Sequence, residues 1–143
     1  MAIFRSHPYG GYNFLVNFDG VEASFAEARV PTAEIEVVEY RDGAAPTNGV
    51  RRLPGITKYT NLVLKRGVVG STDLWEWFKA TTQGDLQRRN VVVTLLDEKR
   101  EAVATYTLRN CLPVKYVGPT LRAGASDVAI EEVELLVESL DLE

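Results

Sequence analysis

The sequence has very little of what enzymes and metal sites most often depend on. It holds one histidine, His7, and one cysteine, Cys111, among 143 residues. A single cysteine excludes an internal disulfide, and no cluster of His, Cys and Asp has the spacing of a zinc site. Phosphate-binding glycine loops and the Gly-x-Ser-x-Gly element of hydrolases are also missing. We therefore expect no catalytic residue, no metal and no cofactor.

Long apolar runs are missing too. No stretch approaches the roughly 18 residues that a membrane-spanning helix needs. The first residues, Met1 to Pro8, lack the apolar centre of a signal peptide, and the chain has no Asn-x-Ser/Thr sequon. These features predict synthesis in the cytoplasm and no insertion of the monomer into a membrane.

The few groups that could react have simpler interpretations. His7 lies in a Pro- and Gly-rich segment that is typical of a solvated side chain. Cys111 precedes Leu112-Pro113, which favours a small core residue over a nucleophile. The pairs Asp97–Glu98 and Glu131–Glu132 are adjacent in sequence, and neighbours on a strand point to opposite faces, so neither pair suits shared acid–base work.

The residues that are present indicate one folded domain, covering residues 1–143. The chain is 45% hydrophobic and 25% charged, which is the composition of a globular protein with one core. Charge is unevenly distributed: residues 41–126 hold fourteen basic and seven acidic side chains, whereas residues 127–143 hold seven acidic and no basic ones. This asymmetry fits either an ordinary solvated surface or head-to-tail complementarity between identical subunits.

Alternating apolar and polar residues predict most of about seven short strands. Residues 91–96 are instead apolar on both faces, which indicates a central strand, and residues 97–101 form a polar hairpin loop. Residues 110–119 continue in extended form, with prolines that suit an edge or a corner. A slip in the alternation at Val37-Val38 predicts a β-bulge. Helical spacing is an alternative for the last strand, but its β-branched residues favour a strand. The predicted strands cover residues 12–18, 34–40, 60–65, 91–96, 103–109, 110–119 and 127–138.

One helix is predicted from Asp73 to about Gly84. Asp73 and Glu76 have capping-box spacing, and Gly84 is a plausible stop. Trp77 falls on the apolar face and is the expected core anchor. Trp75 faces away, so it is either partly exposed or an anchor against a neighbouring molecule.

The stretch between Gly43 and Gly55 is rich in Gly, Ala, Pro and Asn and has little to bury. It predicts a long exposed loop at about 41–59, and loops of this length in compact domains are usually functional or disordered. The fold class is then mainly β: two packed antiparallel sheets, as a sandwich or open barrel, with one flanking helix.

Several segments occur in an order that resembles the tail tube proteins of contractile phages and the inner-tube proteins of phage-derived extracellular contractile injection systems. The resemblance covers nearly the whole chain. The segments are Phe14-Leu15-Val16, Glu36 to Gly43, Val50 to Gly55, Lys58-Tyr59, Leu64 to Gly67, Asp73 to Trp77, Arg88-Arg89-Asn90, Leu95 to Glu98, Lys115 to Pro119 and Ala129-Ile130-Glu131.

The resemblance implies a structural protein without a catalytic step. It implies hexameric rings that stack head to tail into a hollow rod, in a phage tail or a released tail-like particle. The implied partners are identical copies, a sheath protein, baseplate or spike proteins and a terminator, with cargo or DNA passing through the lumen.

Within this framework the exposed segment at 41–59 is the expected contact with the next ring or subunit, and its basic residues would meet carboxylates of residues 34–39 and 127–138 there. The candidate contact residues are Arg41, Arg51, Arg52, Leu53, Lys58, Tyr59, Trp75, Glu34, Glu36, Glu39, Glu131 and Glu134.

Two other function classes stay open at this point. A small-ligand-binding β-barrel would require an apolar interior with spare volume. A hydrolase that uses buried carboxylates would require a specific Asp or Glu on which turnover depends. Neither has a motif in the sequence.

Overall fold

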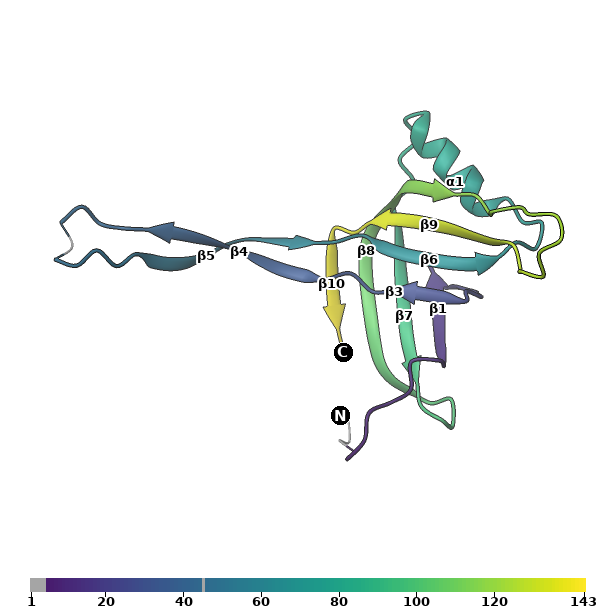
Figure 1. The fold of residues 1–143 in the computed structure, drawn as a ribbon, viewed down its shortest axis with the longest axis horizontal. Coiled ribbons are helices and arrows are strands. Elements are labelled where there is room, and N and C mark those ends of the chain that lie inside the picture. The colour runs from purple at the N-terminus through teal and green to yellow at the C-terminus, as the bar shows by residue number, and fades with distance from the viewer. Residues whose placement is uncertain (1–4, 45) are drawn as a thin grey trace.

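The computed structural model of the protein describes residues 5–44 and 46–143. In these ranges ten strands and one helix form a mainly β body, from which a two-stranded ribbon projects (Figure 1). The predicted fold class, antiparallel sheets with one flanking helix, is confirmed. The sequence prediction misses four strands. One is β5 (Arg51–Tyr59), which it assigns to a loop, and the others have four residues or fewer: β2 (Val21–Ala23), β3 (Glu27–Arg29) and β10 (Ser139–Leu142).

The first layer of the body is an antiparallel sheet with the strand order β2-β1-β7-β8-β10. Its longer strands are β1 (Phe14–Phe18), β7 (Arg89–Leu96) and β8 (Ala102–Val117). β7 and β8 form a hairpin around the polar turn that the sequence predicts at residues 97–101. Strands β1 and β7 pair from Phe14 opposite Leu95 to Phe18 opposite Val91, which sets alternate apolar side chains toward one face.

The second layer contains β6 (Leu62–Gly67) and β9 (Ile130–Leu136), in the order β8-β9-β6-β3. β8 belongs to both layers, because residues 102–111 pair with β7 and residues 112–117 pair with β9. Pro113 lies at a register shift in β8, which agrees with the predicted corner. The two layers run across each other in Figure 1, with the second half of β8 turned to lie alongside β9.

The core lies between the layers. Leu62 and Leu64 of β6, Leu108 of β8 and Leu135 of β9 are fully buried and belong to one cluster. Cys111 joins this cluster, as expected, and burial raises the pKa of its thiol to about 11. An apolar core of this kind stabilises the body without any contribution from the ribbon.

The helix α1 (Asp73–Thr82) covers one flank of the body. Trp77 is buried, donates its indole N–H to the Gln87 carbonyl oxygen at 2.8 Å and packs edge-on against Phe18, so the predicted core anchor is confirmed. The predicted Asp73–Glu76 capping box is wrong. Thr72 is the N-cap residue, and its hydroxyl donates to the Glu76 carboxylate, while Asp73 accepts from the Leu74 amide and Arg66.

The ribbon, called the arm below, consists of β4 (Ala33–Tyr40), β5 (Arg51–Tyr59) and their connection. The arm extends far from the body in Figure 1. No other strand or helix of the described residues packs extensively on β4 or β5. All eight residues of β4 and eight of the nine in β5 are exposed, so the arm has no core of its own.

The predicted loop at 41–59 is therefore wrong in its second half, because residues 51–59 form a strand. The alternation in β5 is interrupted at Pro54-Gly55, where β5 has one residue more than β4 between the pairs Ile35–Thr57 and Val37–Pro54. This bulge lies within two residues of the slip predicted at Val37-Val38. A Cβ at Gly55 would lie 2.9 Å from the Glu36 carbonyl oxygen, so the bulge requires glycine there.

Candidate functional site

The arm carries most of the predicted contact residues, and many of their charges pair within the arm. Lys58 Nζ lies 3.5 Å from the Glu36 carboxylate, and Arg52 Nε lies 3.9 Å from that of Glu39. Glu34 is the register partner of Lys58. Both ion pairs join the two strands of one arm, so a contact of Glu36 or Glu39 with basic residues of another subunit would have to compete with them. Exposed pairs of this kind contribute only about 0–1 kcal/mol.

Two arginines at the tip of the arm differ from the others. Arg41 donates to the Thr47 carbonyl oxygen at 3.2 Å, and Arg51 lies opposite Tyr40 in the ladder. Neither arginine forms an ion pair with a carboxylate in the part of the chain that the structure describes. The tip thus presents two positive charges that are available to an external acidic partner.

The arm also exposes large apolar side chains. Ile56 is 68% exposed, Ile35 54%, Tyr40 53% and Leu53 48%. Tyr59, at the base of the arm, is half-buried. Large apolar side chains exposed together on one projecting element are typical of a surface that contacts another macromolecule.

The three remaining predicted contacts, Trp75, Glu134 and Glu131, lie in the body, and the first two are partly engaged there. Trp75 is 45% exposed, but its ring packs edge-on against Tyr116 and beside Phe78. Glu134 accepts a hydrogen bond from Asn61 and lies 4.0 Å from Lys115. Neither side chain is fully free to receive a neighbour.

Glu131 is wrong as a surface contact, because it is buried. Its carboxylate accepts from Arg66 Nε and from the Tyr116 hydroxyl, each at 2.6 Å. The hydrogen bond to this carboxylate raises the pKa of Tyr116 above its ordinary value. Arg66 also donates to Asp73 at the start of α1, so the network joins β6, β8, β9 and the helix.

Sequence reasoning missed this network, although a signal is present. Arg66 continues the inward phase of Leu62 and Leu64, and Glu131 has the inward phase of Val133 and Leu135. A charged residue of each sign on two inward-facing strand positions indicates a buried pair. The register that places Arg66 opposite Glu131 is not readable from either strand alone.

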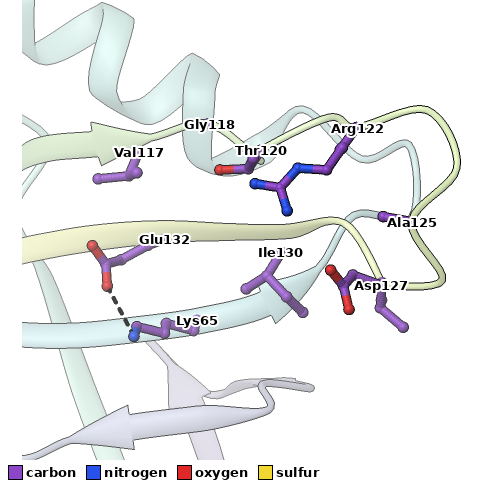
Figure 2. A pocket seen from close by; sticks show the side chains of 10 residues that line it. Lys65, Val117, Gly118, Thr120, Arg122, Ala125, Asp127, Ile130 and Glu132 are labelled. Carbon is purple, nitrogen blue, oxygen red and sulfur yellow. Dashed lines mark ion pairs between the residues drawn. The ribbon is translucent and has the colours of Figure 1, made fainter.

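A groove of about 470 Å³ lies between the loop after β8 and strands β6 and β9, at the end of the body opposite the arm. In Figure 2 the Arg122 side chain points back over this groove, with Asp127 across from it and the Lys65–Glu132 ion pair on its floor. This open, charged lining is not the enclosed apolar interior that a small-ligand barrel requires.

Other surfaces carry no recognisable chemistry. His7 is exposed, and its backbone carbonyl oxygen accepts a hydrogen bond from Arg5 Nε. Residues 5–44 and 46–143 contain no group of His, Cys, Asp and Glu arranged to hold a metal ion. Among the described residues, no helix has the length and apolar character to cross a bilayer.

The comparison with protein families decides the identity. Residues 10–141 match the family described as T4-like virus tail tube protein gp19. The chain belongs to this family. The resemblance inferred from the sequence motifs is thereby confirmed, and the protein is a structural subunit of a tail tube.

Chains from two solved assemblies share the fold over nearly the full chain. A chain from the anti-feeding prophage (AFP) baseplate is 29% identical, with a TM-score of 0.84 and 97% of both chains covered. A chain from the PVC sheath-tube complex of an extracellular contractile injection system, in the extended state, is 23% identical, with a TM-score of 0.86 over 96% of this chain and 93% of that one.

The likeness in fold extends more weakly to Hcp1. Hcp1 from Salmonella typhimurium is 12% identical, with a TM-score of 0.61 over 91% of this chain and 84% of that one, which shows a common fold. A comparison with curated protein sequences gives no match.

Proposed function

We propose that six copies of this chain close into a ring, and that the rings stack head to tail into the hollow inner rod of a contractile injection device or phage tail. In this proposal the whole chain acts as one tail-tube domain without a catalytic step. The observation that carries it is the combination of tube-family membership with an exposed arm that the monomer cannot bury.

Open sheet edges support ring closure. β2 and β3 end the strand order, so each leaves one edge without a strand partner in the described chain. Such edges promote uncontrolled pairing unless something covers them. A closed ring covers them with edges of neighbouring copies, whereas the contact between stacked rings does not close and therefore propagates a filament.

Further partners follow from the assemblies in which similar chains are found. The related structures come from a sheath-tube complex, a baseplate and a tube-terminating cap. We infer corresponding partners for this chain: a sheath around the rod, baseplate or spike proteins at one end and a terminator at the other. The rod would be a passive conduit for cargo or DNA.

The arm is the proposed contact between successive rings. Its tip presents Arg41 and Arg51 without carboxylate partners in the described chain, whereas residues 127–143 hold seven acidic side chains and no basic ones. Glu131, Glu132, Glu134, Glu138 and Asp141 pair within the body, whereas Asp127 and Glu143 are exposed and have no ion pair in the described chain. We infer that the arm tip of one copy meets these two carboxylates of another. Glu36 and Glu39 of the arm stay candidate partners, but they already pair with Lys58 and Arg52.

The test is negative-stain microscopy and sedimentation of the purified protein. The wild type is expected to form rings or rods. The double variant Arg41→Glu/Arg51→Glu is expected to stay folded but to lose most of its pelletable rods. The matched control is Lys99→Glu/Arg100→Glu, which makes the same charge change in the exposed β7–β8 turn. Monodisperse monomers from the wild type would contradict the proposed function, and a wild-type rod yield from the arm variant would remove the arm tip from it.

A further inference from the structure

A second groove, of about 540 Å³, opens beside the N-terminal end of β1 and is called the β1–β3 groove below. Phe14, Leu95 and Tyr106, all in the core-facing phase of the first layer, line one side of it. Ala28 and Val30, from β3 and the residues after it, line the other side. These apolar side chains are only half-buried. The groove therefore leaves one margin of the core open to solvent.

The N-terminal segment that leads to β1 is held at two points (Figure 1). Arg5 forms a bidentate ion pair with Glu98 in the β7–β8 turn, with N–O distances of 2.8 and 3.0 Å. Asn13 accepts a hydrogen bond from the Leu96 amide at its carbonyl oxygen, at 2.9 Å. Terminal segments are usually poorly ordered unless they are tied down. Here both anchors lie on the same hairpin, so residues 6–12 have only local freedom to move.

Tyr12 lies between these anchors, at the rim of the β1–β3 groove. It has the core-facing phase of Phe14 and Val16, and the sequence predicts a strand from residue 12. In the structure β1 begins only at Phe14, and Tyr12 is 72% exposed. A tyrosine in an inward-facing phase is thus turned out of the groove that it borders.

The Tyr12 ring rests against Gly10. A Cβ built on Gly10 would overlap the ring, whereas a Cβ built on Gly11 would meet no atom within 4 Å. Neither glycine has a positive φ, so alanine at either position meets no backbone strain. The outward position of the ring therefore depends on the missing side chain at Gly10.

We propose that Tyr12 is a lid for the β1–β3 groove, and that the structure shows it in the open position. In the closed position β1 is two residues longer, and the ring covers the half-buried side chains of Phe14 and Leu95. Closure removes apolar surface from water, since a tyrosine ring can bury about 150–250 Å². The hydroxyl can stay in water at the mouth of the groove. Because the segment is anchored on both sides of the lid, closure orders few additional residues.

The lid would regulate assembly, and this part of the inference rests on the proposed function. The open lid offers an apolar margin of the core to another macromolecule, whereas the closed lid covers it with the chain's own tyrosine. A partner that covers the groove binds only the open conformation and shifts the population toward it. Dispersed subunits can in this way withhold part of their apolar surface until assembly begins.

Thiol labelling of dispersed protein measures the position of the lid. Ala28→Cys places a reporter in the groove, while the native Cys111 thiol is buried. In this background Gly10→Ala removes the space that the open ring occupies. Gly11→Ala is the matched control, because it adds the same methyl group one residue away without a contact. Gly10→Ala/Tyr12→Ala removes the lid itself, and thermal unfolding followed by circular dichroism checks that the body of each variant is intact.

Gly10→Ala is expected to slow labelling at position 28 by about tenfold, and Gly11→Ala to change it by less than about twofold. The additional Tyr12→Ala substitution should restore the original rate, because no ring remains to cover the groove. Unchanged or faster labelling in Gly10→Ala would overturn the inference. Slow labelling that persists without the tyrosine would overturn it too.

Sedimentation of assembled rods tests the regulatory consequence. Gly10→Ala should raise the protein concentration at which rods appear by about tenfold, and Gly10→Ala/Tyr12→Ala should return it to the wild-type value. Slow labelling together with normal assembly would show that the lid does not control assembly, and would overturn the inference while the proposed function stands. Absence of rods from the wild type would contradict the proposed function, and the labelling rates would still decide whether Tyr12 closes the groove.

Discussion

The body and the arm differ in where their stabilising contacts come from. In the body, Leu62, Leu64 and Leu108 have no exposed surface, and one cluster joins both layers and the helix. In the arm, every residue of β4 is exposed. The comparison shows that the body is stabilised by its own core, whereas the arm has few stabilising contacts within the chain. In the proposed function, copies of the chain supply the missing contacts.

Substitution of Trp77 tests the self-sufficiency of the body and should have the largest effect. Trp77→Ala removes a buried indole, its hydrogen bond to Gln87 and its edge contact with Phe18. A truncation of this kind costs about 3–5 kcal/mol. Urea unfolding of dispersed protein measures it, with Trp75→Ala as the partly exposed control. Equal losses from both variants would show that the helix does not anchor through Trp77.

The second-largest effect is expected for the buried network of Arg66, Glu131 and Tyr116. Glu131→Ala leaves Arg66 with Asp73 as its remaining carboxylate partner and removes the acceptor of Tyr116. We expect a loss of about 3 kcal/mol in the free energy of unfolding, at the low end for a broken buried pair. Glu132→Ala is the control: this neighbour pairs with Lys65 outside the core, so its loss should be below about 1 kcal/mol. Similar losses from both variants would contradict the structural role of the network.

A glycine substitution in the arm should affect assembly and leave the body nearly unchanged. Gly55→Ala places a Cβ 2.9 Å from a backbone oxygen of β4, which must distort the bulge. The expected cost to assembly is about 1 kcal/mol, read from the concentration at which rods form, with little change in urea unfolding. Gly43→Ala is the control, because its Cβ meets no atom within 4 Å. A loss in monomer stability instead would mean that the arm contributes to the body.

The smallest effect concerns Cys111. Burial raises the pKa of its thiol to about 11, above the ordinary value of an unfolded cysteine near ~8.5. As the pH rises, the Cys111 thiol therefore ionises in the unfolded chain before it ionises in the folded chain. The contribution of the buried neutral thiol to the free energy of unfolding is present below about pH 8.5 and declines toward pH 11. Alkylation at pH 8 should be slow in the folded protein and fast in urea. A cysteine placed in the arm by Thr57→Cys should react rapidly in dispersed protein, and fast labelling of Cys111 without denaturant would contradict its burial.

Much of the body is predictable from the sequence because burial imposes a period on it. The alternation in β6, the apolar run of β7, the apolar phase of Trp77 and the apolar neighbours of Cys111 all reflect one shared core. Pro113 marks the corner within β8, because proline has no backbone N–H to donate to a regular ladder.

The arm and the short strands are harder to predict for opposite reasons. β5 has no buried side, so its residues show no regular alternation of apolar and polar side chains. Pro54-Gly55 is a pair typical of loops, although here it forms a bulge within the strand. The strands β2 and β3 have three residues each and contain too little pattern to detect. Glu131 is misplaced because its partner Arg66 is 65 positions away and is brought close only by the register of β6 and β9.

Hydrogen–deuterium exchange, compared between dispersed protein and assembled rods, tests the central claim most directly. The account predicts rapid exchange of the β4 and β5 amides in the dispersed protein, slow exchange of β6, β8 and β9 in both forms, and strong protection of the arm only after assembly. An arm that is equally protected in the dispersed protein, or still unprotected in rods, would contradict the claim that identical neighbours complete it.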